Sequence, residues 1–381
     1  MGQLFSEPPA LNEVEVSIFG PGYGEAVAVH LGNGKWLLVD SCIDPESGLP
    51  AALRYLMQLG VDVAQDVKVI VATHWHDDHL RGMAGLFNAC QSAQLVISSV
   101  LHSTEFRKLI ALYGERSMDR SVGVDEFVRI IELLRSRQSK RGRGAGVRLA
   151  SADKLLWRDE IVAHQGTNSI NVYALSPSDA AVLLAQLALA DQSPQEKGTK
   201  RRLVAPSPNH ASVALWIEIG DIRLLLGADL ERTGEPSTGW AAVVTESKSV
   251  TERASVFKVP HHGSQNGHHD DVWTKLLLPA PFALLTPFRH GRHLLPKPTD
   301  IHRIASLTPN AYVTAPVRAR PDHWRRRVVR DFVQAATKSI EPVYAGWGQV
   351  QLRRVIEDAG AAWRLQLFGD ACGLQASDSS E

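Results

Sequence analysis

The chain is poor in cysteine, with three residues (Cys42, Cys90 and Cys372) among 381. Their odd number and wide spacing exclude a disulfide framework and a cysteine-based zinc site, so we expect a reducing, cytoplasmic environment. Long apolar runs are lacking too, and no charged segment followed by an apolar one opens the chain. We therefore expect neither a membrane span nor a secretory leader.

Net charge is also absent, since Lys plus Arg and Asp plus Glu amount to 41 each. The chain thus lacks the overall field that would attract a nucleic acid or an anionic membrane. Basic residues gather locally instead, in RSRQSKRGRGAGVR at 135–148 and in HWRRRVVR at 323–330. Such segments can attract a phosphate backbone, and the first could equally be a solvated loop.

Strand and helix patterns alternate along the sequence and predict an α/β fold. Helical spacing of apolar residues marks 49–59, and short apolar, β-branched runs predict strands at 14–19, 25–31, 35–40, 67–73, 94–100, 170–177, 254–260, 282–287 and 311–316. The run at 67–73 is apolar almost throughout, as expected of a strand buried on both faces. We expect a single domain over 1–381, with a helical insertion at 104–160 that carries the basic tip, and a C-terminal extension at 317–381 that closes with a β-hairpin.

Metal-binding side chains follow that buried strand, in the segment VATHWHDDHLRGMAG at 71–85. Residues i and i+2 of an extended segment point the same way, so His74 and His76 can chelate one ion. Asp78 and His79 come where the chain turns into a helix and would face a second ion. Imidazole together with carboxylate suits zinc, manganese or iron. The segment lies where α/β sheets bind ligands, and it predicts half of a dinuclear metal site.

The run H-W-H-D-D-H resembles the H-x-H-x-D-H signature of the metallo-β-lactamase superfamily. The resemblance covers about residues 14–316 apart from the insertion. It implies a metallo-β-lactamase-like αβ/βα four-layer sandwich with a helical insertion, and a hydrolase with two divalent metal ions, Zn²⁺ or Mn²⁺. It also implies that Asp40, in LLVDSC, supports the metal loop and that Asp229, in LLLGADLE, bridges the two metals. The family usually has GD at this point, so the intervening Ala228 is a departure.

The last ligand of the family should end another strand, where VFKVPHHGSQNGHH offers His261 and His262. The resemblance implies that one of the two binds the second metal, and spacing does not say which. VPHHGS is close to the branch that includes the nuclease-like domain of bacterial DNA-uptake channel proteins. TPFRHGRHLLPKPTDIHRI, at 286–304, resembles soluble bacterial members encoded beside large NTPases in antiviral defence clusters.

A further ligand, which the family takes from the start of a hairpin, has two interpretations. The hairpin at 212–229 has Asn209 and His210 at its mouth, and we expect His210 to complete the ion held by His74 and His76. In the DNA-uptake branch an N-x-S type segment takes this place, and PNHAS is similar to it. An asparagine would leave that ion open to water or substrate phosphate and would favour manganese.

A metal-dependent phosphodiesterase, acting as a nuclease on DNA or RNA, is the hypothesis that these motifs favour. A hydroxide shared by two cations would be the nucleophile, with Asp78 and Asp229 essential for catalysis. The basic tip would contact the nucleic acid through four cations, Arg137, Lys140, Arg141 and Arg143. Hydrolysis of a small carbonyl substrate, such as a lactone or amide, is the alternative. A third hypothesis is a non-catalytic protein that keeps its metal for stability and binds a regulatory protein partner.

Overall fold

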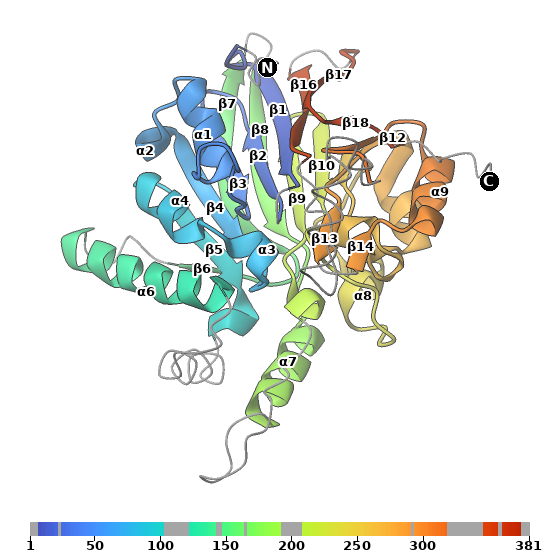
Figure 1. Ribbon diagram of the computed structural model, residues 1–381, viewed down its shortest axis with the longest axis horizontal. Coiled ribbons are helices and arrows are strands. Elements are labelled where there is room, and N and C mark those ends of the chain that lie inside the picture. The colour runs from blue at the N-terminus through green and yellow to red at the C-terminus, as the bar shows by residue number, and fades with distance from the viewer. Residues whose placement is uncertain are drawn as a thin grey trace, which may run out of the picture.

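The computed structural model describes residues 7–21, 24–102, 122–141, 147–163, 166–191, 208–290, 293–317, 346–356 and 360–374. Two eight-stranded sheets form the centre of this part of the chain, and helices cover the outer face of each sheet (Figure 1). The layers therefore run helix, sheet, sheet, helix. This arrangement confirms the α/β sandwich expected from the sequence.

The first sheet joins strands from both ends of the chain, in the order β17-β16-β1-β2-β3-β4-β5-β6. Its strands are β1 (Glu13–Gly20), β2 (Ala26–His30), β3 (Trp36–Val39), β4 (Val67–Ala72), β5 (Gln94–Ser98), β6 (Arg148–Ala150), β16 (Gly348–Val355) and β17 (Arg364–Gly369). The strands from β3 to β6 are parallel, and the other pairs are antiparallel. The hairpin expected near the end of the chain is β16–β17, and its pairing with β1 makes it part of the sheet.

The second sheet has the order β18-β15-β12-β11-β10-β9-β8-β7. Its strands are β7 (Lys154–Ala163), β8 (Gly166–Ala174), β9 (Leu215–Ile219), β10 (Ile222–Leu226), β11 (Ala254–Lys258), β12 (Leu277–Leu285), β15 (Ala311–Val313) and β18 (Cys372–Gly373). Strands β10, β11, β12 and β15 are parallel. A separate small hairpin is formed by β13 (Phe288–His290) and β14 (His293–Leu295).

Three apolar cores hold the four layers together. One lies between the sheets, a second lies between the first sheet and its helices, and a third lies between the second sheet and its helices. The helices are α1 (Ala51–Gln58), α2 (Val63–Asp66), α3 (Asp77–Leu80), α4 (Met83–Ala89), α6 (Val122–Arg141), α7 (Asp179–Asp191), α8 (Gly239–Glu246) and α9 (Pro298–Leu307). Among the described residues, no helix is long and apolar enough to cross a membrane.

Strand β4 shows how the sequence builds this layering. Successive side chains of a strand point to opposite faces. Val69 and Val71 enter the core between the sheets, whereas Ile70 and Ala72 enter the core under the helices. Both faces are apolar, so the strand is central, and its carboxyl end brings the metal loop to the edge of the sheet.

The expected helical insertion at 104–160 is described in part. Helix α6 contacts α3 and α4. Beyond residue 147 the chain forms strands instead, because β6 pairs with β5 and β7 pairs with β8. Ala150 and Leu156 fill the core between the sheets, which explains why this stretch is not helical. The last residues of the expected insertion therefore belong to the two sheets.

A buried polar network lies on the helix-facing side of β1. Glu15 accepts hydrogen bonds from the hydroxyl of Ser17 (2.7 Å), the hydroxyl of Tyr55 (2.7 Å) and Nε of Arg353 (2.9 Å). Burial raises the pKa of Glu15, and the nearby Arg353 charge opposes that rise. Because Tyr55 is on α1 and Arg353 on β16, the network ties both to β1.

Candidate metal centre

The carboxyl ends of parallel strands in both sheets deliver metal-binding side chains to one place. In the first sheet, Asp40 follows β3 and the loop 73–79 follows β4. In the second sheet, Asp229 follows β10 and His262 follows β11. Residues from both sheets approach within ligand distance of one another. The site thus lies where strand ends of α/β sheets bind ligands.

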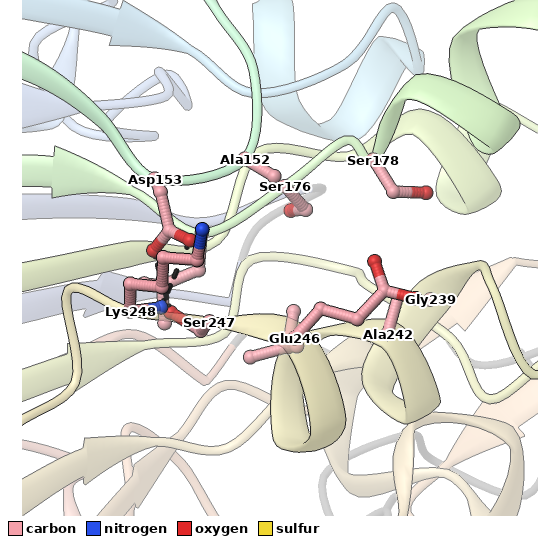
Figure 2. A pocket seen from close by; sticks show the side chains of 11 residues that line it. Ala152, Asp153, Ser176, Ser178, Gly239, Ala242, Glu246, Ser247 and Lys248 are labelled. Carbon is pink, nitrogen blue, oxygen red and sulfur yellow. Dashed lines mark hydrogen bonds between the residues drawn. The ribbon is translucent and has the colours of Figure 1, made fainter.

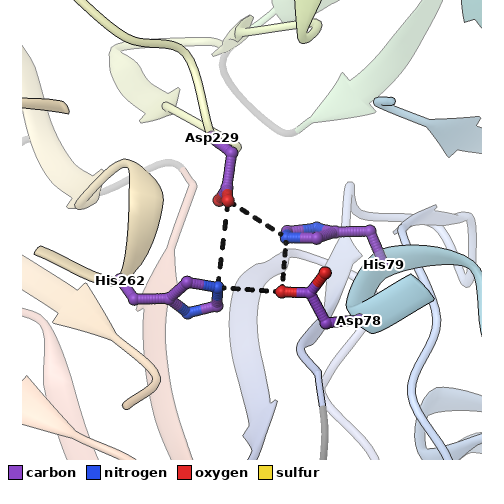
Figure 3. Close-up of side chains that lie close together, drawn as sticks. All are labelled: Asp78, His79, Asp229 and His262. Atoms are coloured by element: carbon purple, nitrogen blue, oxygen red, sulfur yellow. Dashed lines mark hydrogen bonds and ion pairs between the residues drawn. The ribbon is translucent and has the colours of Figure 1, made fainter. Parts of the chain in front are cut away.

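Four buried side chains form the centre of the site, namely Asp78, His79, Asp229 and His262 (Figure 3). One ligand atom from each lies within 4.8 Å of the others. Nε2 of His79 is 3.4 Å from Oδ2 of Asp229 and 3.6 Å from Oδ2 of Asp78. Nε2 of His262 is 3.2 Å from the same Asp78 oxygen and 3.8 Å from the same Asp229 oxygen. Two carboxylates and two imidazoles that converge in this way form a donor set for Zn²⁺ or Mn²⁺.

The surrounding charges also fit a bound cation. The buried ammonium group of Lys258 lies near three buried carboxyl groups, those of Glu25, Asp40 and Asp229. Buried charges are costly unless they are compensated. Within the described residues, Nε2 of His79 and Oδ1 of Asp229 are buried without a well-aligned hydrogen-bond partner. A divalent cation would supply positive charge and bind Nε2 of His79, so the residues present fit a metal ion.

The carboxylates also control the ionisation of His79. Burial by itself lowers the pKa of His79, but Asp229, Asp78 and Asp40 outweigh burial and hold the pKa well above its ordinary value. Burial raises the pKa of Asp229, and the imidazoles of His79 and His262 outweigh it and hold that pKa well below its ordinary range. A proton and a metal ion therefore compete for Nε2 of His79.

Hydrogen bonds at Nδ1 fix how the cluster imidazoles are presented. Nδ1 of His79 lies 2.7 Å from Oδ2 of Asp40, and Nδ1 of His262 lies 3.2 Å from the carbonyl oxygen of Thr286. With each Nδ1–H donated to an oxygen, each Nε2 keeps its lone pair for a metal. The supporting role implied for Asp40 agrees with this geometry.

His74 and His76 form a half-site beside the four-residue cluster. Nε2 of His74 is 3.2 Å from Nδ1 of His76, and the ring centroids of His74 and His79 are 4.2 Å apart. Nδ1 of His74 lies 2.9 Å from the hydroxyl of Thr73, which in turn donates to Asp40. Nε2 of His74 therefore faces His76, and the pair can hold one ion between them.

The structure does not bring His210 to this half-site. His210 lies on the helical turn η3 (Pro208–Ala211), its side chain is 51% exposed, and its Nε2 is 3.3 Å from Glu231. Ser212 contacts His74 at Nδ1 (3.5 Å) rather than at the Nε2 that faces His76, and its hydroxyl accepts a hydrogen bond from the backbone N–H of Asp229 at 3.2 Å. The expected ligand role of His210 is thus corrected, because the turn directs its side chain outward.

Of the two adjacent histidines, His262 enters the cluster and His261 does not. Their φ values are +52° and +48°, in the left-handed region, so the chain turns sharply here and the two side chains diverge. Nδ1 of His261 lies 3.1 Å from Glu231, and its Nε2 lies 3.3 Å from the side-chain nitrogen of Asn209. Both ring nitrogens of His261 face protein groups, and the choice left open by the sequence falls on His262.

Arg137 does not face solvent at the basic tip. Its guanidinium lies 3.8 Å from the centroid of the Phe87 ring and donates to the carbonyl oxygens of Phe87 and Cys90. The side chain is buried and holds α6 against α4, so its expected contact with nucleic acid is corrected. The side chains of Lys140 and Arg141, and the whole of Arg143, lie outside the described residues.

Two buried groups of the site were not expected from the sequence, Glu25 and Lys258. Gly24, which precedes Glu25, has a φ of +117°, and a Cβ there would lie 2.0 Å from the carbonyl oxygen of Asp78. Glycine is therefore required for this loop to pack on the metal loop, and the N–H of Glu25 donates to that same oxygen at 3.1 Å. The available signals were the glycine-rich stretch FGPGYGEA and the lone lysine in the apolar run ASVFKVP.

A pocket of about 330 Å³ lies elsewhere, between the turn at 176–178 and α8 (Figure 2). Two polar side chains that line it, those of Asp153 and Ser176, have partners within the protein. Asp153 accepts the hydroxyl of Ser247 at 2.7 Å, and the hydroxyl of Ser176 donates to the carbonyl oxygen of Ser212 at 2.6 Å. None of the cluster residues lines it. The metal cluster is therefore the stronger candidate for function.

Comparisons with known proteins agree with the metal-loop motif. Residues 19–133 match the family model of the Metallo-beta-lactamase superfamily, a segment that contains Asp40 and the loop 73–79. No curated protein sequence matches the chain. One similar solved structure is the metallo-beta-lactamase fold protein YhfI from Bacillus subtilis, at 12% identity over 65% of this chain and 70% of that chain, with a TM-score of 0.29. Another is metallo-beta-lactamase SMB-1 bound to 2-mercaptoethanesulfonate, at 15% identity over 68% and 83%, with a TM-score of 0.34. Residues 19–133 are thus similar to the metallo-β-lactamase superfamily, whose members are typically metal-dependent hydrolases, and the buried His/Asp cluster fits a metal site.

Proposed function

We propose that this protein is a metal-dependent hydrolase that cleaves phosphodiester bonds, with a nucleic acid as its substrate. The main support is the unequal make-up of the site, which has four donors in one cluster and two imidazoles, His74 and His76, in the half-site. His210, expected as a third imidazole from the family resemblance, faces Glu231 instead, so an ion held by His74 and His76 would keep coordination positions open. The non-bridging oxygens of a phosphodiester can fill such positions.

The residues of the site would have separate roles in binding the cations. Bound divalent cations would supply a hydroxide at neutral pH and stabilise negative charge on the phosphoryl oxygens. Asp40 keeps the proton of His79 on Nδ1, so that Nε2 remains free to bind. Thr73 does the same for His74 through its hydroxyl. One cation would be held by four side chains, those of Asp78, His79, Asp229 and His262.

Hydrolysis of a small carbonyl substrate, a lactone or amide, is the second candidate, because the same hydroxide would serve it. The resemblance of VPHHGS to the nuclease-containing branch favours the phosphodiester. A role in antiviral defence rests on the resemblance at 286–304 and is part of the same proposal. A non-catalytic protein that binds a regulatory partner would not need an open half-site, so this hypothesis ranks third.

A substrate panel tests the proposal. Protein loaded with Zn²⁺ or Mn²⁺ is assayed with single-stranded and duplex DNA, with RNA, with bis-p-nitrophenyl phosphate and with a set of lactones. We expect phosphodiester turnover by the wild-type protein and a loss of about 10²-fold or more in Asp78→Asn, which removes a cluster carboxylate. Asp270→Asn is the matched control, because this exposed carboxylate pairs with His268 away from the cluster and its loss should leave activity unchanged.

The other outcomes select among the alternatives. Lactone turnover without phosphodiester turnover would establish the carbonyl hydrolase instead. Tight metal binding without turnover of any substrate would favour the non-catalytic role.

A further inference from the structure

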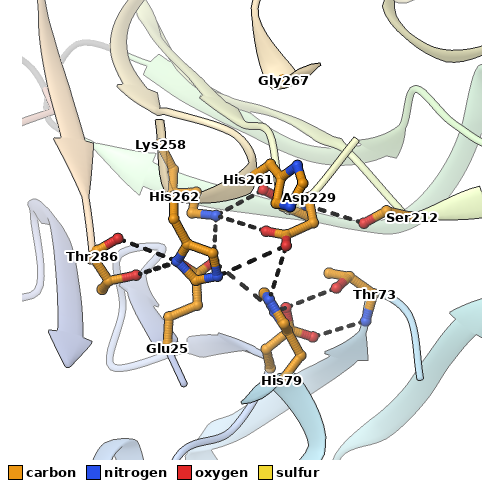
Figure 4. Close-up of polar contacts among 12 residues, drawn as sticks. Glu25, Thr73, His79, Ser212, Asp229, Lys258, His261, His262, Gly267 and Thr286 are labelled. Atoms are coloured by element: carbon orange, nitrogen blue, oxygen red, sulfur yellow. Dashed lines mark hydrogen bonds and ion pairs between the residues drawn. The ribbon is translucent and has the colours of Figure 1, made fainter. Parts of the chain in front are cut away.

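A lysine side chain is buried directly behind the metal cluster. Lys258 ends β11 and is 2% exposed. Its ammonium group pairs with Glu25, lies 3.7 Å from Oδ1 of Asp229 and donates to the carbonyl oxygen of Ala228 at 2.7 Å (Figure 4). Lysine is rarely buried to this extent unless its charge is paired. We therefore expect Lys258 to have a role other than packing.

The turn that carries Asp229 indicates what this role is. Asp229 follows β10 after Gly227 and Ala228, one residue later than in a GD sequence. Ala228 has a φ of +42°, in the left-handed region that residues with a Cβ rarely adopt. Its carbonyl oxygen accepts hydrogen bonds from Nζ of Lys258 and from the backbone N–H of His261 (3.0 Å). These two bonds hold an unfavourable conformation immediately before the metal-binding carboxylate.

The charge of Lys258 also acts on the carboxylate itself. Oδ1 of Asp229 lies on the side of the ammonium group, while Oδ2 faces His79 and His262. Attraction between the ammonium group and Oδ1 favours this orientation and leaves Oδ2 for the cluster. Glu25, which pairs with Lys258, also accepts the hydroxyl of Thr286 at 2.6 Å. The lysine is thereby fixed on both sides.

We propose that Lys258 is a positioning residue that delivers Asp229 to the metal cluster. Its hydrogen bond to Ala228 fixes the left-handed turn, and its charge sets which oxygen of Asp229 faces the metal. The inference rests on the metal site of the proposed function. It assigns to a buried lysine a role in metal binding that requires no contact with substrate.

Zinc affinity in a Lys258→Met variant tests this role. Affinity is measured by competition with a chromophoric chelator, and the visible spectrum of the cobalt(II)-loaded protein reports the ligand geometry. We expect at least tenfold weaker zinc binding and an altered cobalt spectrum. Ala228→Gly added to Lys258→Met should restore about threefold or more of that loss, because glycine adopts a positive φ without the Cβ penalty. Lys275→Met is the matched control, since this exposed lysine pairs with Asp271 and should bind zinc as the wild type does.

The results separate failure of this inference from failure of the metal site. A wild-type protein that binds neither zinc nor cobalt would overturn both. Normal zinc affinity and an unchanged cobalt spectrum in Lys258→Met would overturn the positioning role alone, and so would a complete lack of recovery on adding Ala228→Gly. If Lys258→Met does not fold, Glu25→Gln/Lys258→Met removes both members of the ion pair. It should show the same tenfold loss, and wild-type affinity in that variant would refute the proposal.

Discussion

Replacement of Asp40 by asparagine should weaken metal binding by moving a proton on His79. Asp40 has a φ of +58°, a left-handed conformation in which asparagine is among the best-tolerated residues, so the backbone should keep its shape. Its carboxylate accepts three hydrogen bonds. Two come from the N–H and hydroxyl of Thr73, at 2.8 and 2.7 Å, and the third comes from Nδ1 of His79 at 2.7 Å.

An asparagine side chain cannot accept all three bonds. If its oxygen keeps the N–H of Thr73, its NH₂ group takes the position of Oδ2 and faces the Nδ1–H of His79. Two donors then oppose each other, and the imidazole relieves the conflict by carrying its proton on Nε2, the atom that faces the cluster. Metal binding must displace that proton. Loss of such a carboxylate–histidine contact typically costs about 10- to 100-fold in metal affinity, or about 1.4–2.8 kcal/mol.

Zinc competition at neutral pH measures the affinity, and the ¹⁵N shifts of the imidazole show which nitrogen of His79 carries the proton. Asp44→Asn is the matched control. Asp44 is also a buried carboxylate, but it accepts from Ser47 and Arg54 and not from a cluster imidazole. Unchanged zinc affinity in Asp40→Asn, with Nδ1 of His79 still protonated, would refute the reasoning.

Three further outcomes follow from single side chains. His210→Ala should bind the same number of metal ions at the same affinity in a metal titration, because its imidazole lies outside the half-site; loss of one equivalent would make it a ligand after all. Arg137→Met should lower the free energy of unfolding by about 1–3 kcal/mol through its lost bonds to buried carbonyl groups, and a flatter salt dependence of DNA binding would contradict its structural role. Burial lowers the pKa of His30 from 6.5 to about 4. Between these pH values the unfolded chain binds a proton at His30 that the folded protein does not. The free energy of unfolding should therefore be unaffected by His30 above pH 6.5 and should decrease as the pH falls towards 4, by up to about 3 kcal/mol. Urea unfolding across this range should show a smaller loss in His30→Gln, and an equal loss would contradict the assignment.

The metal loop could be predicted from the sequence because its information is local. A buried strand ends at Ala72, and four potential ligands follow within seven residues, in a spacing that permits few other uses. Asp229 could be expected only through the family resemblance, which implies a metal-bridging carboxylate after an apolar strand. The choice between His261 and His262 could not, since it depends on two successive left-handed residues that no pattern of residue types reveals.

The buried position of Arg137 could have been predicted from the sequence, although its positive charge suggests a place on a basic surface. Phe127, Ile130, Leu134 and Arg137 recur at intervals of three and four, which is the spacing of one helix face. The first two are buried and Leu134 packs against the same core, so the aliphatic stem of Arg137 joins an apolar face. An interpretation based on the positive charges alone misses this helical periodicity.

Contacts over long distances in the sequence account for the remaining differences. The polar sequences of β6 and β7 do not predict strands, and these segments are extended because they pair with β5 and β8. The side chain of His210 turns away because Glu231, on the far side of a hairpin, lies next to it. The sequence gives no reason for a lysine in the apolar strand that contains Lys258, because its partners Glu25 and Ala228 come beside it only in the folded protein.

The pairing of β1 with β16 has a consequence for synthesis of the chain. Glu15 and Arg353 are 338 residues apart. At roughly 5–20 residues per second, a ribosome needs on the order of 20–70 s to cover that distance. Throughout this interval one edge of β1 has no strand beside it, and unpaired edges promote aggregation between nascent chains. An acidic side chain in such an edge opposes pairing with another polypeptide, so we expect Glu15 to protect the growing chain before Arg353 arrives to neutralise it.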